Sequence, residues 1–438
     1  MKLGPVDVAS VTCQAPYIIA RAINSFDFLS VVSKCSQLRR SYLTTMADLK
    51  YDFPWHLGVF DAHCHPTDTM SSISSIPEMN AKVLTVMATR AQDQELVSSV
   101  AHDIGLKSSD APLEQQWQDQ SKMIPSFGWH PWFSYQMFDE NMYDGKTTLS
   151  DEDRIAHFQS VLTPKSEDKD FLLRLPEPRP FRQFIEQTKR YLEKHPLALV
   201  GEIGLDRAFR LPETWLPEQR QDRNDELTPG GREGRRLSPY RVSMDHQRLI
   251  LKAQLNLAGE LHRPVSVHGV QVHGILYEAL SETWKGHERK VLSRRERKEL
   301  KSTQKRQADV EDMTEISKDA DTSPKPYPPR ICLHSYSGPP DQVKQYLQPS
   351  IPAEIFFSFS EVINFDKPST KAGEVIKMLP DDKILIESDL HTAGERMDEY
   401  LEAVVRRVCK LKGWPLEDGV KQLAKNWKRF VSGSETAS

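Results

Sequence analysis

Three kinds of feature are scarce in this sequence: long apolar runs, paired cysteines and an excess of charge of one sign. No stretch of its 438 residues approaches the roughly 20 consecutive apolar residues that a membrane-spanning helix needs, so we expect no membrane contact. The five cysteines are odd in number, lie far apart and include no Cys-x-x-Cys pair, which argues against a disulfide framework and a cysteine zinc site. We therefore expect a reducing location, either cytoplasmic, nuclear or both.

The charge balance excludes a protein that coats nucleic acid through its whole surface. A formal net charge of -4 gives no global attraction to a polyanion, so DNA would have to be held by a local basic patch or by bound metal. The 38% of hydrophobic residues suffices for a globular core, while 27% charged residues and 29 prolines indicate long solvated loops. The length allows two average domains, but a barrel with insertions can use most of it as one domain.

Residues 1–56 show no pattern of a folded domain, and we interpret them as a disordered N-terminal extension. The Ser-rich, Arg-bearing segment 21–42 is similar to a mitochondrial transit peptide, but the acidic Asp7 and Asp27 argue against targeting. Met46 opens a segment that leads directly into the first predicted strand and would make a natural start. We therefore favour an extension over a mitochondrial signal.

Eight apolar runs of strand length follow, beginning at residues 57, 82, 123, 197, 264, 330, 354 and 383. Segments with helical spacing, such as 181–195 and 244–262, separate most of them, and this alternation predicts a parallel α/β sheet. The runs are continuously apolar, as expected of parallel strands buried on both faces. Eight such units predict one catalytic domain over 57–434, a distorted TIM (β/α)8 barrel, although an open doubly wound sheet would show the same periodicity.

Four long insertions interrupt this rhythm, near 103–121, 135–180, 207–241 and 286–328. Each is polar, charged or rich in proline and glycine, so we predict excursions from the barrel rather than strands. The last joins a basic run to an acidic one, a composition typical of solvated helix or disorder. Its arginines and lysines are also candidates for a nucleic-acid contact. We expect a protein partner, if the chain has one, to bind at 286–328.

Imidazole and carboxylate side chains fall at the carboxyl ends of five of the eight predicted strands. They are His63 and His65 on the first, Glu202 on the fourth, His268 on the fifth, His334 on the sixth and Asp389 on the eighth. In a TIM barrel these ends converge on the active-site face. One histidine at a strand end is more often structural than a ligand, but six converging candidates indicate a metal site. The mixture of imidazole and carboxylate favours a pair of transition-metal ions over magnesium alone.

The segments that carry these residues resemble the signatures of the TatD family of deoxyribonucleases, in the order that the family has them. They are FDAHCHPTD (60–68), FGWHP (127–131), LVGEIGLDR (199–207), PVSVHG (264–269), CLHSYSG (332–338) and ILIESD (384–389). The His-x-His pair alone would be weak evidence, whereas all six segments in order make a chance match improbable. The predicted strands at 82 and 354 contribute no matching residue.

The resemblance implies a two-metal site with divided ligands: His63, His65 and Asp389 on one ion, His268 and His334 on the other, and Glu202 on both. The ions would be zinc, manganese or magnesium. They would activate a water that cleaves phosphodiester bonds of DNA, in single strands or at strand ends. Asp389 is the natural candidate to orient that water and accept its proton. Protonation of the ligands would dismantle the site, so activity should fall in acid.

The resemblance also implies supporting roles for residues near the ligands. His130 would contact the substrate phosphate, Asp206 would bind substrate or support a ligand, and Glu387 would orient nearby ligands. For Asp206 and Glu387, loop capping or a salt bridge is an equally good interpretation. Asn426 is similar to the asparagine of the family's closing helix, which implies that it seals the bottom of the barrel.

Two positions depart from the family pattern. Where the family follows its fifth-strand histidine with a small residue and then a basic one, this chain has Gly269 and Val270, so a positive charge near the substrate phosphate is missing. The proline that commonly follows the last metal-binding Asp is replaced by Leu390 and His391. We interpret His391 as a lone exposed side chain rather than an extra contact.

Two other functions fit parts of the pattern. An amidohydrolase acting on small cyclic amides shares most of the ligands, but such enzymes usually bridge their metals with a modified lysine, where this chain has Glu202. A barrel kept as a scaffold, with weak or no catalysis, would explain the enlarged loops. They are similar to those of fungal family members that partner a tetratricopeptide subunit of the cell-cycle ubiquitin ligase. The intact ligand set favours a hydrolase over a scaffold.

Overall fold

The computed structural model describes residues 53–107, 121–215, 234–291, 296, 323–366 and 371–433. The predicted extension 1–56 lies almost entirely outside these residues, as do the central parts of the insertions near 103–121, 207–241 and 286–328. Among the described residues, no helix is both long and apolar enough to cross a membrane.

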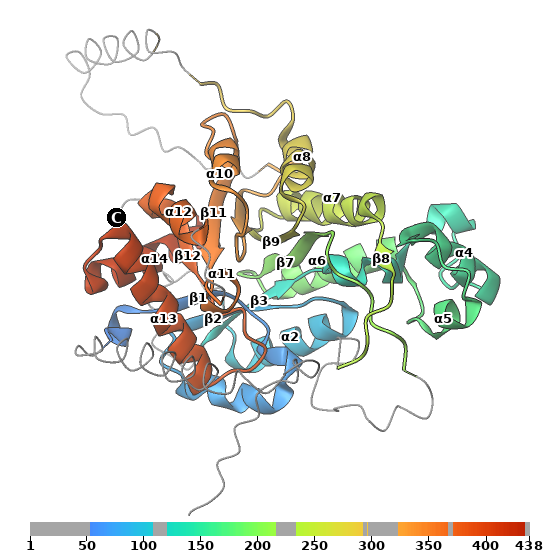
Figure 1. Cartoon of the computed structure of the whole chain (residues 1–438), viewed down its shortest axis with the longest axis horizontal. Helices are drawn as coiled ribbons and strands as arrows, with labels where there is room; N and C mark the ends of the chain where they lie inside the picture. The colour runs from blue at the N-terminus through green and yellow to red at the C-terminus, as the bar shows by residue number, and fades with distance from the viewer. Residues whose placement is uncertain are drawn as a thin grey trace, which may run out of the picture. The chain divides into compact units, whose positions relative to one another are not determined.

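Eight parallel strands form the centre of the fold (Figure 1). In spatial order they are β1 (Phe60–Cys64), β2 (Val83–Met87), β3 (Met123–Phe127), β7 (Leu199–Asp206), β9 (Val265–Val270), β10 (Arg330–Leu333), β11 (Glu354–Phe359) and β12 (Ile384–Ile386). At the seam between β1 and β12, Asp389 N donates to His63 O at 3.0 Å and His65 N donates to Leu390 O at 2.8 Å. The strands thus form a nearly closed barrel, as predicted, and the open-sheet alternative is wrong.

Helices follow the strands along the outside of the barrel. They are α2 (Ala91–Ile104), α6 (Phe181–Lys194), α7 (Met244–Glu260), α8 (His273–Trp284), α10 (Pro340–Tyr346), α11 (Glu361–Asn364), α12 (Lys371–Met378) and α13 (Glu395–Lys412). After β1 the chain forms the 3-10 helix η3 (Met70–Glu78) where a regular barrel has an α-helix. This replacement is one source of the distortion.

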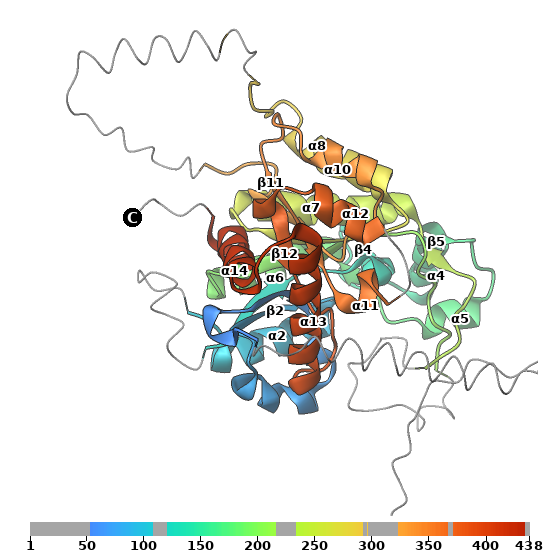
Figure 2. The ribbon, with the colours of Figure 1, turned by 60° about the vertical axis from the view of Figure 1, so that its left-hand side comes forward.

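The C-terminal helix α14 (Leu416–Ser432) closes the amino-terminal end of the barrel (Figure 2). Its Trp427 stacks on Phe60, the first residue of β1, with ring centroids 4.4 Å apart. Asn426 Nδ2 donates to the carbonyl oxygens of Asp381 at 2.7 Å and Ile384 at 2.8 Å. Asn426 therefore ties the closing helix to the start of β12, and the barrel is open for chemistry only at its carboxyl end.

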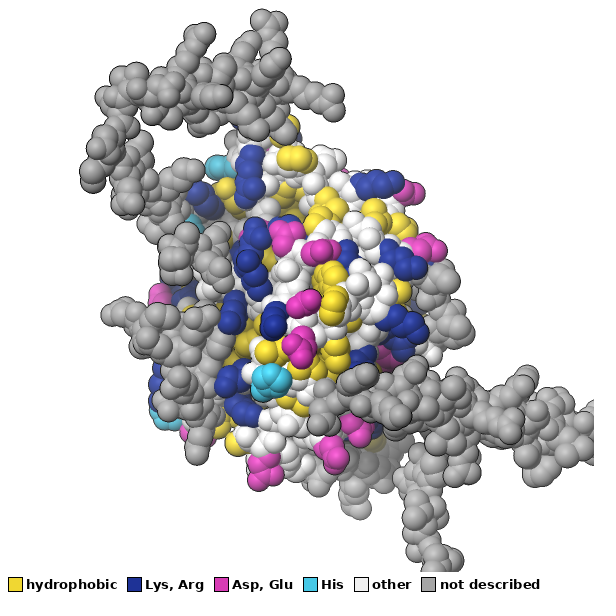
Figure 3. Space-filling view, turned by 90° about the vertical axis from the view of Figure 1, so that its left-hand side faces the viewer, with side chains coloured by type: hydrophobic (Ala, Val, Ile, Leu, Met, Phe, Trp, Pro, Cys, Tyr) yellow, Lys and Arg dark blue, Asp and Glu magenta, His cyan; other side chains and the backbone are white. Residues whose placement is uncertain are grey.

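The side of the molecule at the left of Figure 1, which carries α13 and α14, is shown in Figure 3. Lysine and arginine side chains there are interspersed with acidic ones. Arg429 lies 2.9 Å from Asp382 and 2.6 Å from Glu354, and Lys383 lies 2.7 Å from the same Glu354. Part of the positive charge on this side is therefore neutralised locally.

The insertion near 135–180 is folded, and the prediction that it contains no strand is wrong. It holds α4 (Asp151–Val161), α5 (Lys169–Arg174) and the short strands β4 (Met137–Phe138), β5 (Leu162–Thr163) and β6 (Arg179–Pro180). Strand β4 pairs with β6, and β5 pairs with β8 (Arg241–Val242). Its small core contains Tyr135, Phe158, Val161, Leu162, Phe171, Leu172, Leu175, Leu211 and Val242. Contacts with the distant Leu211 and Val242 complete this core.

The four insertions leave the barrel at opposite ends. Those near 135–180 and 207–241 follow β3 and β7, so they leave from the carboxyl ends of strands, where barrel enzymes place their active sites. Those near 103–121 and 286–328 precede β3 and β10, so they leave from the amino end. The described ends of the first two insertions therefore lie at the same end of the barrel as the predicted site.

Strands β7 and β9 approach each other closely at Gly204, whose φ is +154°. A Cβ there would overlap the backbone carbonyl of His268. We expect Gly204→Ala to lower the free energy of unfolding by about 3 kcal/mol, because backbone on two central strands would have to move. Denaturant unfolding measures this change.

The matched control is Gly274→Ala in α8, where a Cβ would meet nothing within 4 Å. This variant should be as stable as the parent, or more stable by up to about 1 kcal/mol, since alanine favours helix. Equal losses of stability in the two variants would contradict the close approach at Gly204.

Candidate metal centre

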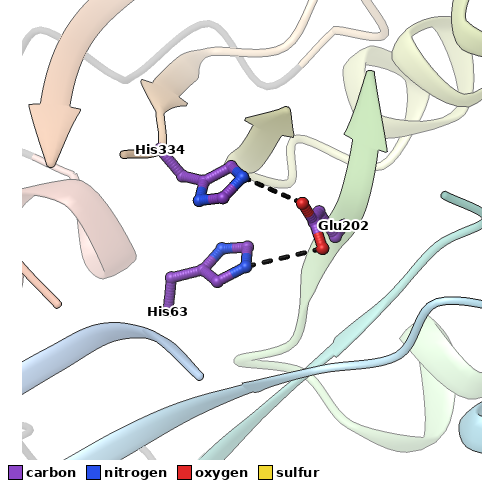
Figure 4. Close-up of side chains that lie close together, drawn as sticks. All are labelled: His63, Glu202 and His334. Carbon is purple, nitrogen blue, oxygen red and sulfur yellow. Dashed lines mark ion pairs between the residues drawn. The ribbon is translucent and has the colours of Figure 1, made fainter. Parts of the chain in front are cut away.

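All six predicted ligands lie together at the carboxyl end of the barrel, around the carboxylate of Glu202. Its Oε1 is 2.9 Å from His268 Nδ1 and 2.8 Å from His334 Nε2. Its Oε2 is 3.6 Å from His63 Nε2 and 3.3 Å from His65 Nε2. Figure 4 shows Glu202 between His334 and His63, with one oxygen turned toward each. The two oxygens therefore face two different pairs of predicted ligands.

Asp389 completes one of these groups. Its Oδ1 lies 3.9 Å from His63 Nε2 and 3.7 Å from His65 Nε2. The ligand atoms of His63, His65 and Asp389 all lie within 4.8 Å of one another, as do those of His63, Glu202 and His334. Converging imidazole nitrogens and carboxylate oxygens in a buried site fit divalent cations of the zinc or manganese type.

A local irregularity in β1 turns both histidines of the His-x-His pair toward the centre. The pairing of β1 with β2 shifts register between Asp61 and Cys64. The fully buried Asp61 accepts hydrogen bonds from His63 N at 3.0 Å and Ser388 N at 3.1 Å, and another from the Ser388 hydroxyl. Asp61 thereby joins the strand end that carries His63 to the segment that carries Asp389.

Comparison with known proteins assigns the chain to a family. The family model described as "TatD related DNase" matches residues 60–432, which include every candidate ligand. The chain belongs to the TatD family. It is therefore a metal-dependent hydrolase.

Two relatives and one solved structure are similar to this chain over most of its length. Cut9-interacting protein scn1 of Schizosaccharomyces pombe is 35% identical over 374 residues, which span 85% of this chain and 98% of that relative. An uncharacterized deoxyribonuclease of Saccharomyces cerevisiae is 27% identical over 314 residues, 71% of this chain and 77% of the relative. The structure of YjjV, a TatD homologue from Escherichia coli, aligns with a TM-score of 0.44 at 18% identity, covering 85% of this chain and 97% of that one.

In this TatD-family chain, Asp206 holds the His268 ring in place. Its Oδ2 lies 3.1 Å from His268 Nε2 and accepts from Trp132 Nε1 at 2.6 Å. Its Oδ1 accepts from the backbone of Ala208 at 2.6 Å and Phe209 at 2.8 Å. Burial raises the pKa of Asp206, but the hydrogen bond and charge of His268 outweigh it and lower the pKa. An ionised Asp206 accepts a hydrogen bond from Nε2 of His268. This orients the ring so that its other nitrogen, Nδ1, faces Glu202.

Glu387 lies next to His334, as Asp206 lies next to His268. It accepts from Ser335 N at 2.8 Å and from the hydroxyls of Ser335 and Ser358. Its Oε1 is 3.5 Å from His334 Nδ1, a distance that suits attraction between charges and is too long for a hydrogen bond. Glu387 is thus positioned to orient His334.

His130, the predicted phosphate contact, is buried inside the cluster. Its Nδ1 accepts from Trp132 N at 3.2 Å, so in the neutral ring Nε2 carries the proton. Nε2 lies 3.2 Å from Glu202 Oε1. Burial lowers the pKa of His130 to about 4, which keeps the ring neutral at pH 7. His130 therefore supplies an N–H donor directed at Glu202.

His391 is exposed, as predicted, but it is not alone. Its Nδ1 lies 2.6 Å from Asp68 Oδ2, and its ring stacks on His65 with centroids 5.2 Å apart. The departure from the family pattern at this position thus contributes a ring that covers one side of a predicted ligand.

The two strands without a predicted site residue also contribute side chains to this end. Arg90 follows β2; it is 4% exposed, lies 3.4 Å from Asp93 and covers the ring of Phe133. Ser358 of β11 donates to Glu387. Arg90 could have been found from the sequence, because an arginine close after an apolar run is conspicuous. Ser358 could not, because a serine within an apolar strand does not stand out.

Cation binding to this centre should release protons. Burial lowers the pKa of its histidines, but in three of them the hydrogen bonds and charges of neighbouring carboxylates outweigh this effect. They raise the pKa of His65 to about 9 and also raise those of His268 and His334. The His65 ring holds a proton at pH 7, and metal ligation needs neutral imidazole, so we expect release of at least one proton per chain.

An indicator-dye titration with zinc chloride measures this release. The number of protons should fall as the pH rises past 9, where His65 is already neutral. Burial lowers the pKa of His63 to about 3, so this ring adds no proton. A release that grows with rising pH would contradict the charge distribution of the centre.

Proposed function

We propose that this chain hydrolyses phosphodiester bonds of DNA, in single strands or at strand ends, with two divalent cations on either side of Glu202. His63, His65 and Asp389 would hold one cation, and His268 and His334 the other. The observation that carries the proposal is the division of the Glu202 oxygens between the two groups. Membership of the family and the deoxyribonuclease name of one relative support the choice of substrate.

When bound, the cations supply an acidified water at neutral pH and neutralise the phosphodiester oxygens. Asp389 is placed to accept a proton from that water. Burial raises the pKa of Asp389 to about 6. Its side chain is 14% exposed, against 5% for Glu202 and 6% for His65, so it borders the open side of the centre. His130 is placed to donate a hydrogen bond, and the donor set favours zinc or manganese.

Assays on two substrate classes test this proposal. The parent chain should release nucleotides from single-stranded DNA in the presence of zinc or manganese and should leave a panel of small cyclic amides intact. EDTA should abolish the release, and added metal should restore it. Turnover of a cyclic amide without turnover of DNA would support the amidohydrolase alternative instead.

A second function, protein binding, is favoured by one observation. A relative that matches 85% of this chain carries the name of an interacting protein. The described residues on either side of the insertion near 286–328 lie at the amino end of the barrel, opposite the metal centre, which supports a binding surface separate from hydrolysis. Deleting residues 297–322 should abolish capture of such a partner and leave the metal content unchanged. Loss of metal together with capture would contradict this separation.

A further inference from the structure

Two aromatic side chains stack beside the metal centre, and neither serves as a ligand. Trp132 follows β3, and Phe209 follows β7. Their rings are nearly parallel, at 9°, with centroids 4.4 Å apart. The Trp132 ring lies edge-to-face with His130 at 4.6 Å and with His268 at 6.0 Å. Both aromatic side chains are partly exposed. The stacked pair therefore begins at the edge of the centre and reaches solvent.

One carboxylate fixes this pair and a metal ligand together. Asp206 accepts from Trp132 Nε1 and from Phe209 N, and it faces His268 Nε2. On their buried sides, Trp132 packs against the core cluster that contains Trp129 and Phe133, while Phe209 packs against the core of the folded insertion. The rings are thus rigid before any ligand arrives, which reduces the entropy lost on binding.

Positive charge flanks the aromatic pair. Arg207 and Arg210, on either side of Phe209 in sequence, are both exposed. Arg207 N donates to Val270 O at 3.1 Å. The backbone of Arg207 therefore lies beside Val270, the position that lacks the basic residue of the family pattern. Aromatic rings with interleaved arginines are the usual means of holding single-stranded nucleic acid.

We infer that Trp132 and Phe209 form a stacking subsite for a nucleobase next to the scissile phosphate, with Arg207 and Arg210 holding the adjacent backbone. The inference rests on the proposed function and specifies its substrate: a polynucleotide with unpaired bases, bound with little dependence on sequence. A phosphodiester without a base would occupy the centre but not this subsite. A small cyclic amide would lack the phosphates that the arginines contact.

Binding of matched oligonucleotides tests the subsite. The Kd is measured by fluorescence anisotropy in EDTA for a labelled single-stranded oligodeoxynucleotide and for an abasic strand of the same length. The parent should bind the base-bearing strand more tightly. Stacking on an aromatic side chain is sensitive to its removal, so Phe209→Leu and Trp132→Leu should each reduce this preference about tenfold.

Three further variants separate stacking from structure. Trp132→Phe loses the donor to Asp206 but keeps an aromatic face, so it should retain most of the preference for bases. Replacing Arg207 and Arg210 by glutamine should weaken binding of both strands alike and reduce the salt dependence. Tyr400→Leu, which removes a partly exposed aromatic of α13 that lies under Arg396, should leave the ratio of the two Kd values unchanged.

The outcomes distinguish the subsite from the proposed activity. If Phe209→Leu lowers the melting temperature but leaves the preference for bases at the parent value, the pair is purely structural and the inference is wrong. If the parent binds both strands equally, the inference is also wrong. If the parent prefers bases but hydrolyses neither strand when metal is supplied, the subsite stands and the proposed hydrolysis fails.

Discussion

Glu202→Gln should abolish turnover of single-stranded DNA, with kcat at least about a thousandfold below that of the parent. Cation activation of water and of the phosphodiester contributes several kcal/mol, and a loss of about 4 kcal/mol corresponds to a thousandfold in rate. The amide keeps the shape of the carboxylate but loses the charge that faces five imidazoles at 2.8–3.6 Å. Both cations should be retained poorly, which elemental analysis of the purified variant measures.

The effect is large because Glu202 contacts both groups of predicted ligands. Burial raises the pKa of Glu202, but its interactions with the His130, His334 and His63 rings outweigh this effect and hold the pKa well below the ordinary range. The variant should remain folded, since His130 can donate to the side-chain oxygen of the new amide as it does to the carboxylate. A variant that retains two cations per chain and near-parental turnover would refute the bridging role.

Asp389→Asn should lower kcat by about a hundred- to ten-thousandfold, the usual contribution of a proton acceptor in a hydrolytic step. The amide cannot accept the proton, and it also binds a cation less well beside His63 and His65. The KM should change little, because the His268 and His334 side of the centre is intact. Steady-state kinetics with single-stranded DNA measures both parameters.

Asp68→Asn is the matched control for this change. Asp68 also lies at the mouth, but its carboxylate pairs with His391 rather than with Glu202 or a predicted ligand pair. Its pKa is lowered, because the hydrogen bond from His391 and the charge of His65 outweigh burial. The variant should keep activity within a few-fold of the parent. Equal reductions of kcat in the two variants would mean that Asp389 acts only through the overall negative charge at the carboxyl end of the barrel.

The barrel could be predicted from sequence because parallel strands buried on both faces leave continuous apolar runs. Each predicted run corresponds to one strand of the barrel, although the first strand begins at Phe60 rather than at 57. The difference arises at Gly58, where a φ of +91° ends the 3-10 helix η1 (Trp55–Leu57) before the strand begins. A local turn of this kind is set by contacts that periodicity does not record.

The small fold between β3 and α6 could not be predicted in the same way. Its apolar residues are scattered among charged ones, and its core is completed by Leu211 of a different insertion and by Val242, which directly follows that insertion. Two insertions that each look polar in sequence thus bury a shared set of side chains. The pairing of β5 with β8 and the hydrogen bond from Leu211 N to Tyr240 O bring these side chains together.

The candidate ligands could be named because the carboxyl ends of parallel strands meet at one face. The sequence did not indicate which ring nitrogen of each histidine faces which carboxylate. The orientation of His268 depends on Asp206 and Trp132, and the bend at His63 depends on Asp61 and Ser388, residues that are far apart in the chain. Ring orientation is decided by such hydrogen bonds, and they have no signature in a single sequence.

Anomalous X-ray diffraction from crystals of the parent chain grown with manganese or zinc tests the central claim most directly. The account predicts two anomalous peaks, both in contact with Glu202, one bound by His63, His65 and Asp389 and the other by His268 and His334. A single peak that does not touch Glu202, or no peak at the carboxyl end of the barrel, would contradict it.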